Sequence, residues 1–375
     1  MRKRMGTFTI IAVAAALIAL FSCPVAAKVT GVCSDCHTMH NSQGGATIYA
    51  EGPYETLLVN GCVGCHTAPA GVQNDGTNTI PYVNQATEPT FIGQANPNTL
   101  SGGSFYWVAT AGGGEDAKGH NVLGISERDT IAYAPGGGTR GCASTCHETL
   151  AEEQDIIPDL GTGCEGCHLS VGHHADDGAY AGGAKHVTSA PWYRFLSAHP
   201  TAVGSLGVEG IEHEKWNYGA TASLHNEYLG KPDVEMDKKA NFFALGNTVT
   251  AFCCGCHGDF HDENEEEDGS GNWIRHPADH EIPDSGEYAS AFGASGGTGT
   301  YDPDVPVARP DLSSGTPSGT VTLGPGGDMV MCLSCHVAHG SPYDDMLRWD
   351  YNGMIADGGG ADGTGCFVCH TKKDD

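Results

Sequence analysis

The chain has 375 residues, of which 16 are cysteine, 19 histidine and 55 glycine, while hydrophobic residues make up 39% and charged residues 17%. This composition is poor in the apolar and helix-forming residues from which a conventional core of that length is built, so a non-protein apolar group is expected to complete the core. The formal net charge of −28 excludes nucleic acid and anionic membrane surfaces as electrostatic partners.

Residues 1–27 have the three parts of a secretory signal: a basic start at Met1-Arg-Lys-Arg4, an apolar stretch from Thr7 to Phe21, and small residues ending at Ala27. The apolar stretch is too short and too early to predict a membrane span. In a second interpretation Leu20-Phe21-Ser22-Cys23 is a loose lipobox, and Cys23 is then lipidated. We expect export, with residues 28–375 forming one domain.

The pattern Cys-x-x-Cys-His occurs six times after this signal. Its two thiols can bond to the two vinyl groups of a haem, and the histidine that follows then lies beneath the iron as the proximal ligand. Zinc sites and disulfides would not require a histidine after every second cysteine. The six motifs, named below by their first cysteine, are Cys33/Cys36/His37, Cys62/Cys65/His66, Cys164/Cys167/His168, Cys253/Cys256/His257, Cys332/Cys335/His336 and Cys366/Cys369/His370.

A seventh motif, Cys142/Cys146/His147, has one extra residue between its cysteines. The longer loop must bulge to place both sulfurs, and the neighbouring Gly141 gives it local freedom. We therefore predict a provisional seventh haem, with a metal-free thiol pair as the alternative. The two cysteines and the histidine of one motif are called its clamp below. Cys254 fits neither cysteine position of a clamp and is expected to be a thiol that attaches no haem.

Twelve further histidines can supply second axial ligands, which is more than seven haems need. Two imidazoles on each iron leave no open position, so this supply predicts electron transfer at low reduction potential rather than catalysis. The predicted distal ligands are His40, His120, His174, His186, His225, His261, His276 and His339. The other four, His173, His199, His213 and His280, are expected to be solvated or to support ligands through hydrogen bonds.

His40 and His339 each follow a proximal histidine by three residues. A segment of that length spans at most about 10 Å, too short to pass around a porphyrin edge to its opposite face. Each must therefore ligate a neighbouring haem or none, which would bring adjacent haems close together.

The sequences between the motifs are rich in glycine and proline and show little sustained helical or strand periodicity. They predict a loop-rich multihaem c-type cytochrome with short helices around the motifs, little sheet and stacked haems as the core. One longer helix is expected over residues 148–156, before Pro158.

Several segments resemble the extracellular multihaem cytochromes of metal-reducing bacteria, including the OmcS and OmcE type that polymerises into nanowires. The resemblance is carried by residues 31–42, 118–121, 273–277 and 331–340 and by the last motif near the C-terminus. It implies that His40 crosses to a neighbouring subunit and completes its Cys332 haem. The chain departs from that pattern in its seven motifs, its stretched Cys142 clamp, and the regions 172–174 and 193–196.

Three functions remain open from the sequence. The first is an extracellular or cell-surface electron conduit that passes electrons to metal oxides, electrodes or other multihaem cytochromes, as a homopolymer joined through His40. The second is a monomeric shuttle in the periplasm or at the cell surface. The third is a multihaem reductase of nitrite, hydroxylamine or a sulfur oxyanion, which would require an open haem.

Overall fold

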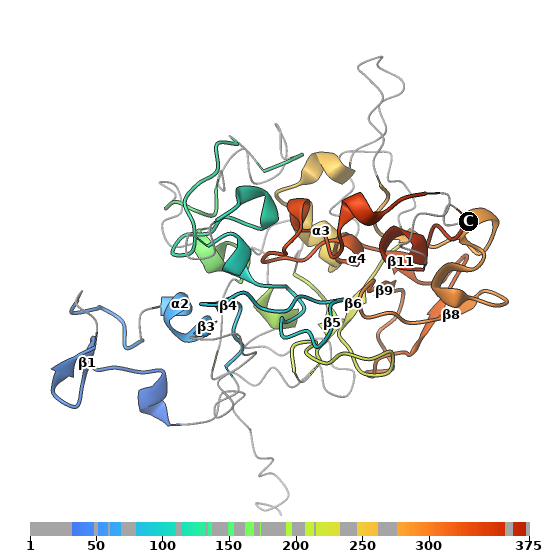
Figure 1. Cartoon of the computed structure of the whole chain (residues 1–375). Helices are drawn as coiled ribbons and strands as arrows, with labels where there is room; N and C mark the ends of the chain where they lie inside the picture. Colours follow the sequence, from blue (N-terminus) through green and yellow to red (C-terminus); the bar gives the residue numbers. More distant parts are fainter. Residues whose placement is uncertain are drawn as a thin grey trace, which may run out of the picture.

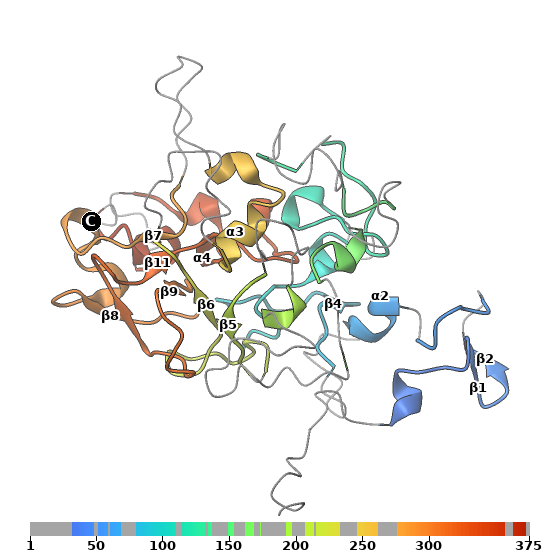
Figure 2. The same ribbon diagram turned by 180° about the vertical axis from the view of Figure 1, so that it is seen from behind.

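The structure is a computed structural model (Figures 1 and 2), and it describes fifteen ranges of the chain. They are 32–48, 52–58, 61–68, 80–109, 114–131, 134–136, 149–153, 162–168, 173, 193–196, 207–213, 215–232, 246–261, 276–356 and 363–372.

Some predicted features lie outside these residues. They are the signal peptide, the seventh motif with Cys142, Cys146 and His147, and the candidate distal ligands His174 and His186. Haem attachment at Cys142 and Cys146, and proximal ligation by His147, therefore stay predictions from the sequence.

Helices in the described ranges are short, as expected from the glycine-rich sequence, and the longest is α2, Gly61–His66. Half of them overlap a motif or directly follow one, which confirms the prediction of a loop-rich chain with short helices at the clamps. The other α-helices are α3 (Val249–Cys253) and α4 (Cys332–Cys335). The 3-10 helices are η1 (Cys33–Asp35), η2 (Phe105–Trp107), η4 (Asp116–Lys118), η6 (Gly163–Gly166), η8 (Tyr193–Phe195), η10 (Gly258–His261), η11 (Gly286–Tyr288), η12 (Ala291–Gly293), η13 (Asp344–Met346), η14 (Tyr351–Gly353) and η15 (Gly365–Val368).

The largest sheet of the described residues has five very short strands in the order β5-β6-β9-β11-β7. These strands are β5 (Gly210–Ile211), β6 (Glu227–Leu229), β9 (Ala308–Arg309), β11 (Met329–Val330) and β7 (His280–Glu281). Strands β6 and β9 are parallel, and the other pairs are antiparallel. Three two-stranded pairs complete the sheet content: β1 (Ser42–Gln43) with β2 (Ala46–Thr47), β3 (Thr67–Ala68) with β4 (Asn84–Gln85), and β8 (Thr298–Thr300) with β10 (Thr320–Thr322).

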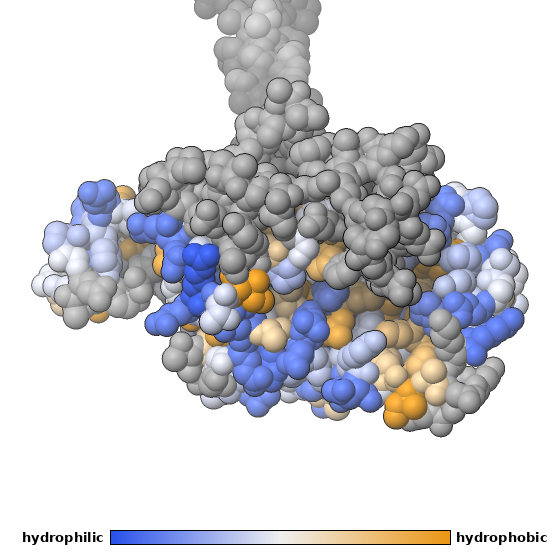
Figure 3. All heavy atoms as spheres, turned by 90° about the horizontal axis from the view of Figure 1, so that it is seen from above, coloured by the Kyte–Doolittle hydropathy of each residue, from blue (hydrophilic) through white to orange (hydrophobic). Residues whose placement is uncertain are grey.

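Several small apolar clusters take the place of one continuous core. One gathers around Phe292 and Tyr301 beside β8 and β10, and another around Tyr228 and Met329 on the central sheet. Seen from above, apolar side chains lie between polar ones rather than forming one uninterrupted face (Figure 3). Protein side chains alone therefore build only local packing centres.

Residues 32–58, here called the N-terminal arm, project from the body of the molecule with β1 and β2 (Figures 1 and 2). The C-terminal segment lies toward the opposite side of the body in both views. The first and last motifs are therefore far apart.

The predicted helix over 148–156 is wrong for its described part, because residues 149–153 are not helical. The carbonyl of Leu150 accepts hydrogen bonds from the backbone N–H groups of Leu123 (2.8 Å) and Gly163 (2.7 Å). Tertiary hydrogen bonds thus use the carbonyl that a helix would have used as acceptor, and they override the local helix propensity.

Candidate haem-binding site

Each described motif closes on itself as one tight turn. The backbone N–H of the proximal histidine donates to the carbonyl of the first cysteine, at 2.8 Å for His37 and His168 and at 3.0 Å for His257, His336 and His370. His66 ends α2, which contains its whole motif. Such a turn gathers two thiols and an imidazole within five residues, as attachment to one porphyrin edge requires.

The same turn holds the second cysteine of a motif. The backbone N–H of Cys256 donates to Cys253 O at 3.1 Å, and that of Cys36 donates to Cys33 O at 3.3 Å. Cys253 and Cys256 are both half-buried, whereas Cys254 between them is buried, and its N–H donates to Thr250 O at 2.9 Å. The extra cysteine therefore leaves the turn of this motif intact, and the turn supports the prediction that Cys256 attaches a haem.

Three motifs start from a glycine with positive φ, directly before the first cysteine. The angles are 65° at Gly61, 53° at Gly163 and 54° at Gly365. Glycine adopts this left-handed conformation without the steric cost that other residues carry. It lets an extended chain turn sharply into the clamp.

The thirteen described cysteines are thiols rather than halves of disulfides, as haem attachment requires. A hydrogen bond from Cys164 lowers the pKa of Cys62 to about 7. Burial, together with the neighbouring Cys366 and Cys369, raises the pKa of Cys335 to about 12. Thiols of different motifs therefore lie close enough to perturb one another.

These interactions between thiols link the six described motifs in one row. Side-chain hydrogen bonds join Cys36 to Cys65, Cys62 to Cys164 and Cys253 to Cys332, and electrostatic interactions link Cys167 with Cys253 and Cys335 with Cys366 and Cys369. The order is 33, 62, 164, 253, 332 and 366, which follows the sequence and is continuous without the Cys142 motif.

The proximal histidines share one hydrogen-bonding arrangement, in which Nδ1 faces an oxygen acceptor. Protonation at Nδ1 leaves Nε2 as the nitrogen with a lone pair, which is the form that binds a metal. The acceptors are Leu57 O for His37 (3.1 Å), Pro81 O for His66 (2.8 Å), Arg194 O for His168 (2.9 Å), Pro135 O for His257 (2.7 Å), Asp345 O for His336 (2.7 Å) and Glu287 Oε1 for His370 (3.3 Å).

Four proximal histidines lie opposite a second histidine at nearly constant separation. The ring centroids are 6.1 Å apart for His66 and His173, 6.2 Å for His168 and His339, 6.1 Å for His257 and His120, and 6.2 Å for His370 and His276. Two imidazoles on opposite faces of one iron, each with an Fe–N bond of about 2.0 Å, would have centroids about 6.3 Å apart. The donor set and its spacing fit a bis-histidine haem at each of these four places.

Three segments that are distant in sequence meet at His339 and His120. The His339 N–H donates to Gly102 O (2.8 Å), and the His120 N–H donates to His339 O (3.2 Å). His120 Nδ1 lies 2.7 Å from the carbonyl of Ala338, 218 residues away in the chain. Residues 336–339 thus contribute to three motifs: His336 to its own, Ala338 to the Cys253 site and His339 to the Cys164 site.

Close backbone approach explains why glycine stands beside this junction. A Cβ on Gly102 would lie 2.8 Å from His339 Nδ1, and one on Gly119 would lie 2.3 Å from His339 O. Phe105 stacks on the His339 ring with centroids 4.6 Å apart. The ring is therefore clamped between a glycine backbone and an aromatic side chain.

Burial favours the neutral form of several paired imidazoles, which is the form that ligates a metal. It lowers the pKa of His339 to about 3, with nearby His168 and His120 acting in the same direction. It also lowers the pKa of His257 to about 4, again with a contribution from His120. The pKa values of His66 and His168 are lowered for the same reason.

His173 was expected to be solvated or to support a ligand through a hydrogen bond. Its ring lies opposite His66, and it is exposed in the polypeptide alone. The neighbouring His174 was predicted as the ligand instead. Adjacent histidines in Gly172-His-His174 signalled a ligand, but nothing local distinguished one from the other.

His225 is placed differently from the paired histidines. Its ring is fully buried and stacks on Tyr301 with centroids 3.6 Å apart, and Nε2 faces Glu227 Oε1 at 3.4 Å. Nδ1 contacts Thr221 O at 3.1 Å. Nε2 is buried and makes no hydrogen bond in the polypeptide, so ligation of a haem by His225 stays a prediction from the sequence.

The remaining predicted distal ligands are only partly described. His40 is exposed on the N-terminal arm, with Nδ1 2.9 Å from Tyr54 O. His261 ends η10, and its side chain lies outside the described residues. Among the described residues, no second histidine ring pairs with His336.

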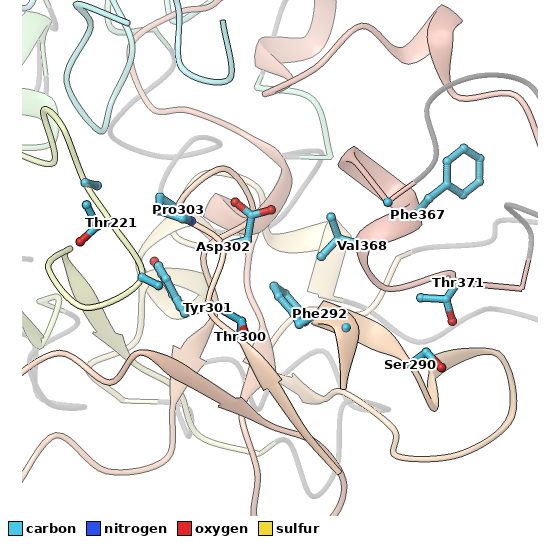
Figure 4. Close-up of a pocket in the computed structure, with 14 residues that line it drawn as sticks. Thr221, Ser290, Phe292, Thr300, Tyr301, Asp302, Pro303, Phe367, Val368 and Thr371 are labelled. Atoms are coloured by element: carbon cyan, nitrogen blue, oxygen red, sulfur yellow. The ribbon is translucent and has the colours of Figure 1, made fainter. Parts of the chain in front are cut away.

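A cavity of about 600 Å³ lies beside the last motif (Figure 4). Tyr301 and Phe292 face Val368 across it. Its lining includes the carboxylate of Asp302 but none of the motif cysteines or histidines. It adjoins the last clamp through Phe367 and Val368, the two residues between Cys366 and Cys369.

Thiol pairs, proximal imidazoles with Nδ1 bound and opposing second imidazoles together define a multihaem c-type cytochrome, which is an electron-transfer protein. No described helix is both long and apolar enough to cross a lipid bilayer.

Comparison with known proteins extends this assignment. A family described as a doubled CXXCH motif matches residues 325–375, which contain the last two clamps. C-type cytochrome OmcS of Geobacter sulfurreducens is 25% identical over 371 residues, covering 85% of this chain and 78% of its own. The chain is thus an OmcS-like multihaem cytochrome. Two solved structures of OmcS filaments from Geobacter sulfurreducens match with TM-scores of 0.47 and 0.45 at 19% identity, covering 93% of this chain and 93% and 92% of theirs.

Proposed function

We propose that this protein is an extracellular electron conduit that binds haem c at six Cys-x-x-Cys-His motifs and at the Cys142 motif. The four histidine pairs with centroids 6.1–6.2 Å apart are the observation that carries the proposal. Bound haem supplies reversible one-electron chemistry at each clamp, and the row of clamps supplies a path through the chain.

The chain's own residues hold and orient the ligands. In this proposal His173, His339, His120 and His276 are the second axial ligands at the Cys62, Cys164, Cys253 and Cys366 motifs, and His147 is the proximal ligand at the seventh. Backbone carbonyls hold most of the proximal rings in the tautomer that leaves Nε2 for the metal. Because two imidazoles occupy each of the four paired sites, these residues leave no position for a substrate there, which favours electron transfer over reduction of nitrite or a sulfur oxyanion.

Two histidines, one near each end of the row of motifs, support assembly of several copies of the chain. His40 is exposed on the projecting arm, and His336 has no second histidine opposite it among the described residues. We propose that His40 of one copy completes the Cys332 site of the next, which would join subunits into a homopolymer. The net charge of −28 keeps such an assembly soluble. OmcS, the relative described above, forms filaments, which agrees with this arrangement.

Intact mass and electron microscopy of the exported protein test the proposal. The mass is expected to correspond to residues 28–375 with seven haems, and negative-stain images are expected to show filaments. His40→Ala should leave the haem content unchanged and yield monomers, while His280→Ala, at an exposed histidine with Nδ1 near Glu281 O, should still polymerise. Wild-type protein that stays monomeric at high concentration would instead identify a shuttle.

A further inference from the structure

Arg348 is folded against the clamp of the Cys332 motif. The segment 344–348 runs antiparallel to the end of that clamp, through a bridge between His336 and Leu347. The Arg348 backbone N–H donates to Cys335 O at 2.9 Å. The side chain continues the contact, because Nε donates to Leu333 O at 2.7 Å and to His336 O at 3.2 Å. Both ends of the residue are thus tied to the motif backbone.

Among the described residues, no carboxylate pairs with the buried charge of Arg348. The side chain is 5% exposed, and its Nη1 atom is buried with no hydrogen-bond partner. No carboxylate of the described residues lies within 4 Å of its guanidinium. The carboxylate of the described residues that influences it most is Asp304, which forms no ion pair with it.

Arg309 provides the contrast within the same chain. It is equally buried, at 4% exposure, but its guanidinium pairs with Glu227 at 3.0 Å and with Asp328. It also donates to the carbonyls of Ser318 and Thr320, both at 2.8 Å. Burying a cation without a partner is costly, so the two arginines are held for different reasons. Arg309 joins strands, whereas Arg348 brings a net positive charge to a clamp.

We propose that Arg348 raises the reduction potential of the haem at the Cys332 motif, by holding against that clamp a buried positive charge that no carboxylate of the described residues pairs with. The inference rests on the proposed function. Reduction adds one electron to the site, and a fixed cation stabilises that electron most strongly where water cannot screen it. Burial is therefore what makes this charge effective.

The test is a redox titration of the fully loaded protein, followed by electron paramagnetic resonance of the low-spin ferric haems. Arg348→Gln removes the charge and should lower one component by at least about tenfold in its equilibrium constant, or about 59 mV for one electron. The low-spin signature and the haem content should be unchanged, which a loss of clamp structure would not allow. Arg128→Gln, an equal charge change at an exposed pair with Glu152, should leave every component in place.

The outcomes separate the two proposals. A fully loaded, low-spin Arg348→Gln protein with unchanged or raised potentials would overturn the role of Arg348. If that variant fails to load haem, Arg348→Lys is titrated at pH 6 instead. Retention of the wild-type potential supports a charge effect. A fully loaded protein in which one component falls tenfold in its equilibrium constant contradicts it. Wild-type protein without haem at the Cys332 motif would refute the proposed function instead.

Discussion

Removing the imidazole of His339 should open one haem and leave the others closed. His339 follows the Cys332 clamp in sequence but lies opposite His168 of the Cys164 clamp, with ring centroids 6.2 Å apart. His339→Ala therefore takes the second ligand from the Cys164 site. The Cys332 site keeps His336, whose Nδ1 contact with Asp345 O is independent of residue 339.

The size of the effect follows from the number of motifs. With seven haems, about one-seventh of the ferric haem should change from low spin to high spin or to water ligation. The truncation also removes a ring packed on Phe105, with centroids 4.6 Å apart, so a loss of about 2–3 kcal/mol in folding stability is expected besides the lost ligation. His339→Met should keep the site low spin but raise its potential, because a thioether ligand favours ferrous haem.

Magnetic circular dichroism of the purified ferric protein measures the high-spin fraction directly, with haem content checked by intact mass. His280→Ala is the control, because that histidine is exposed and pairs with no proximal histidine ring among the described residues. A His339→Ala protein that remains entirely low spin would refute the pairing with His168. A change at two haems would show that residue 339 also supports its own clamp.

Three further predictions test other parts of the structure. Gly102→Ala should displace the His339 ring, since the new methyl would lie 2.8 Å from Nδ1. The spectrum of this variant should show partial high-spin haem. Gly353→Ala is the control and should show none, because no atom lies within 4 Å of the added carbon. Changing both Cys142 and Cys146 to serine should lower the intact mass by one haem. Electron transfer along the row should remain, because the thiols of the six other motifs interact without this one. A protein that loses no haem mass would show that the motif carries no haem. Arg309→Met should lower the free energy of unfolding of the loaded protein by about 3–5 kcal/mol in denaturant titration, because it leaves Glu227 and Asp328 as buried carboxylates without their cation, and a loss below about 1 kcal/mol would contradict that reasoning.

Much of the candidate site follows from local spacing. Two thiols and an imidazole must come from one turn, so Cys-x-x-Cys-His can be read directly from the sequence, and the structure shows that turn at His168 and His370. The glycine-rich connections likewise predicted the short elements. Where a local pattern competed with tertiary hydrogen bonds, as at Leu150, the prediction of a helix was wrong.

The second ligands required the fold. His173 and His174 are equivalent in sequence, and only the approach of residue 173 to His66 separates them. His225 is buried and stacks on Tyr301, and its ligation of a haem stays a prediction from the sequence.

The sequence by itself determined the polyanionic charge and predicted the motifs that attach haem and the need for haem as a core, because covalent attachment depends on a five-residue spacing. It also predicted, from chain length alone, that His339 must ligate a neighbouring haem or none. Only the tertiary structure placed its ring opposite His168, since that depends on where the backbones of Gly103 and Gly340 meet. A proximal ligand is a local property of the chain, and a distal ligand is a property of the fold.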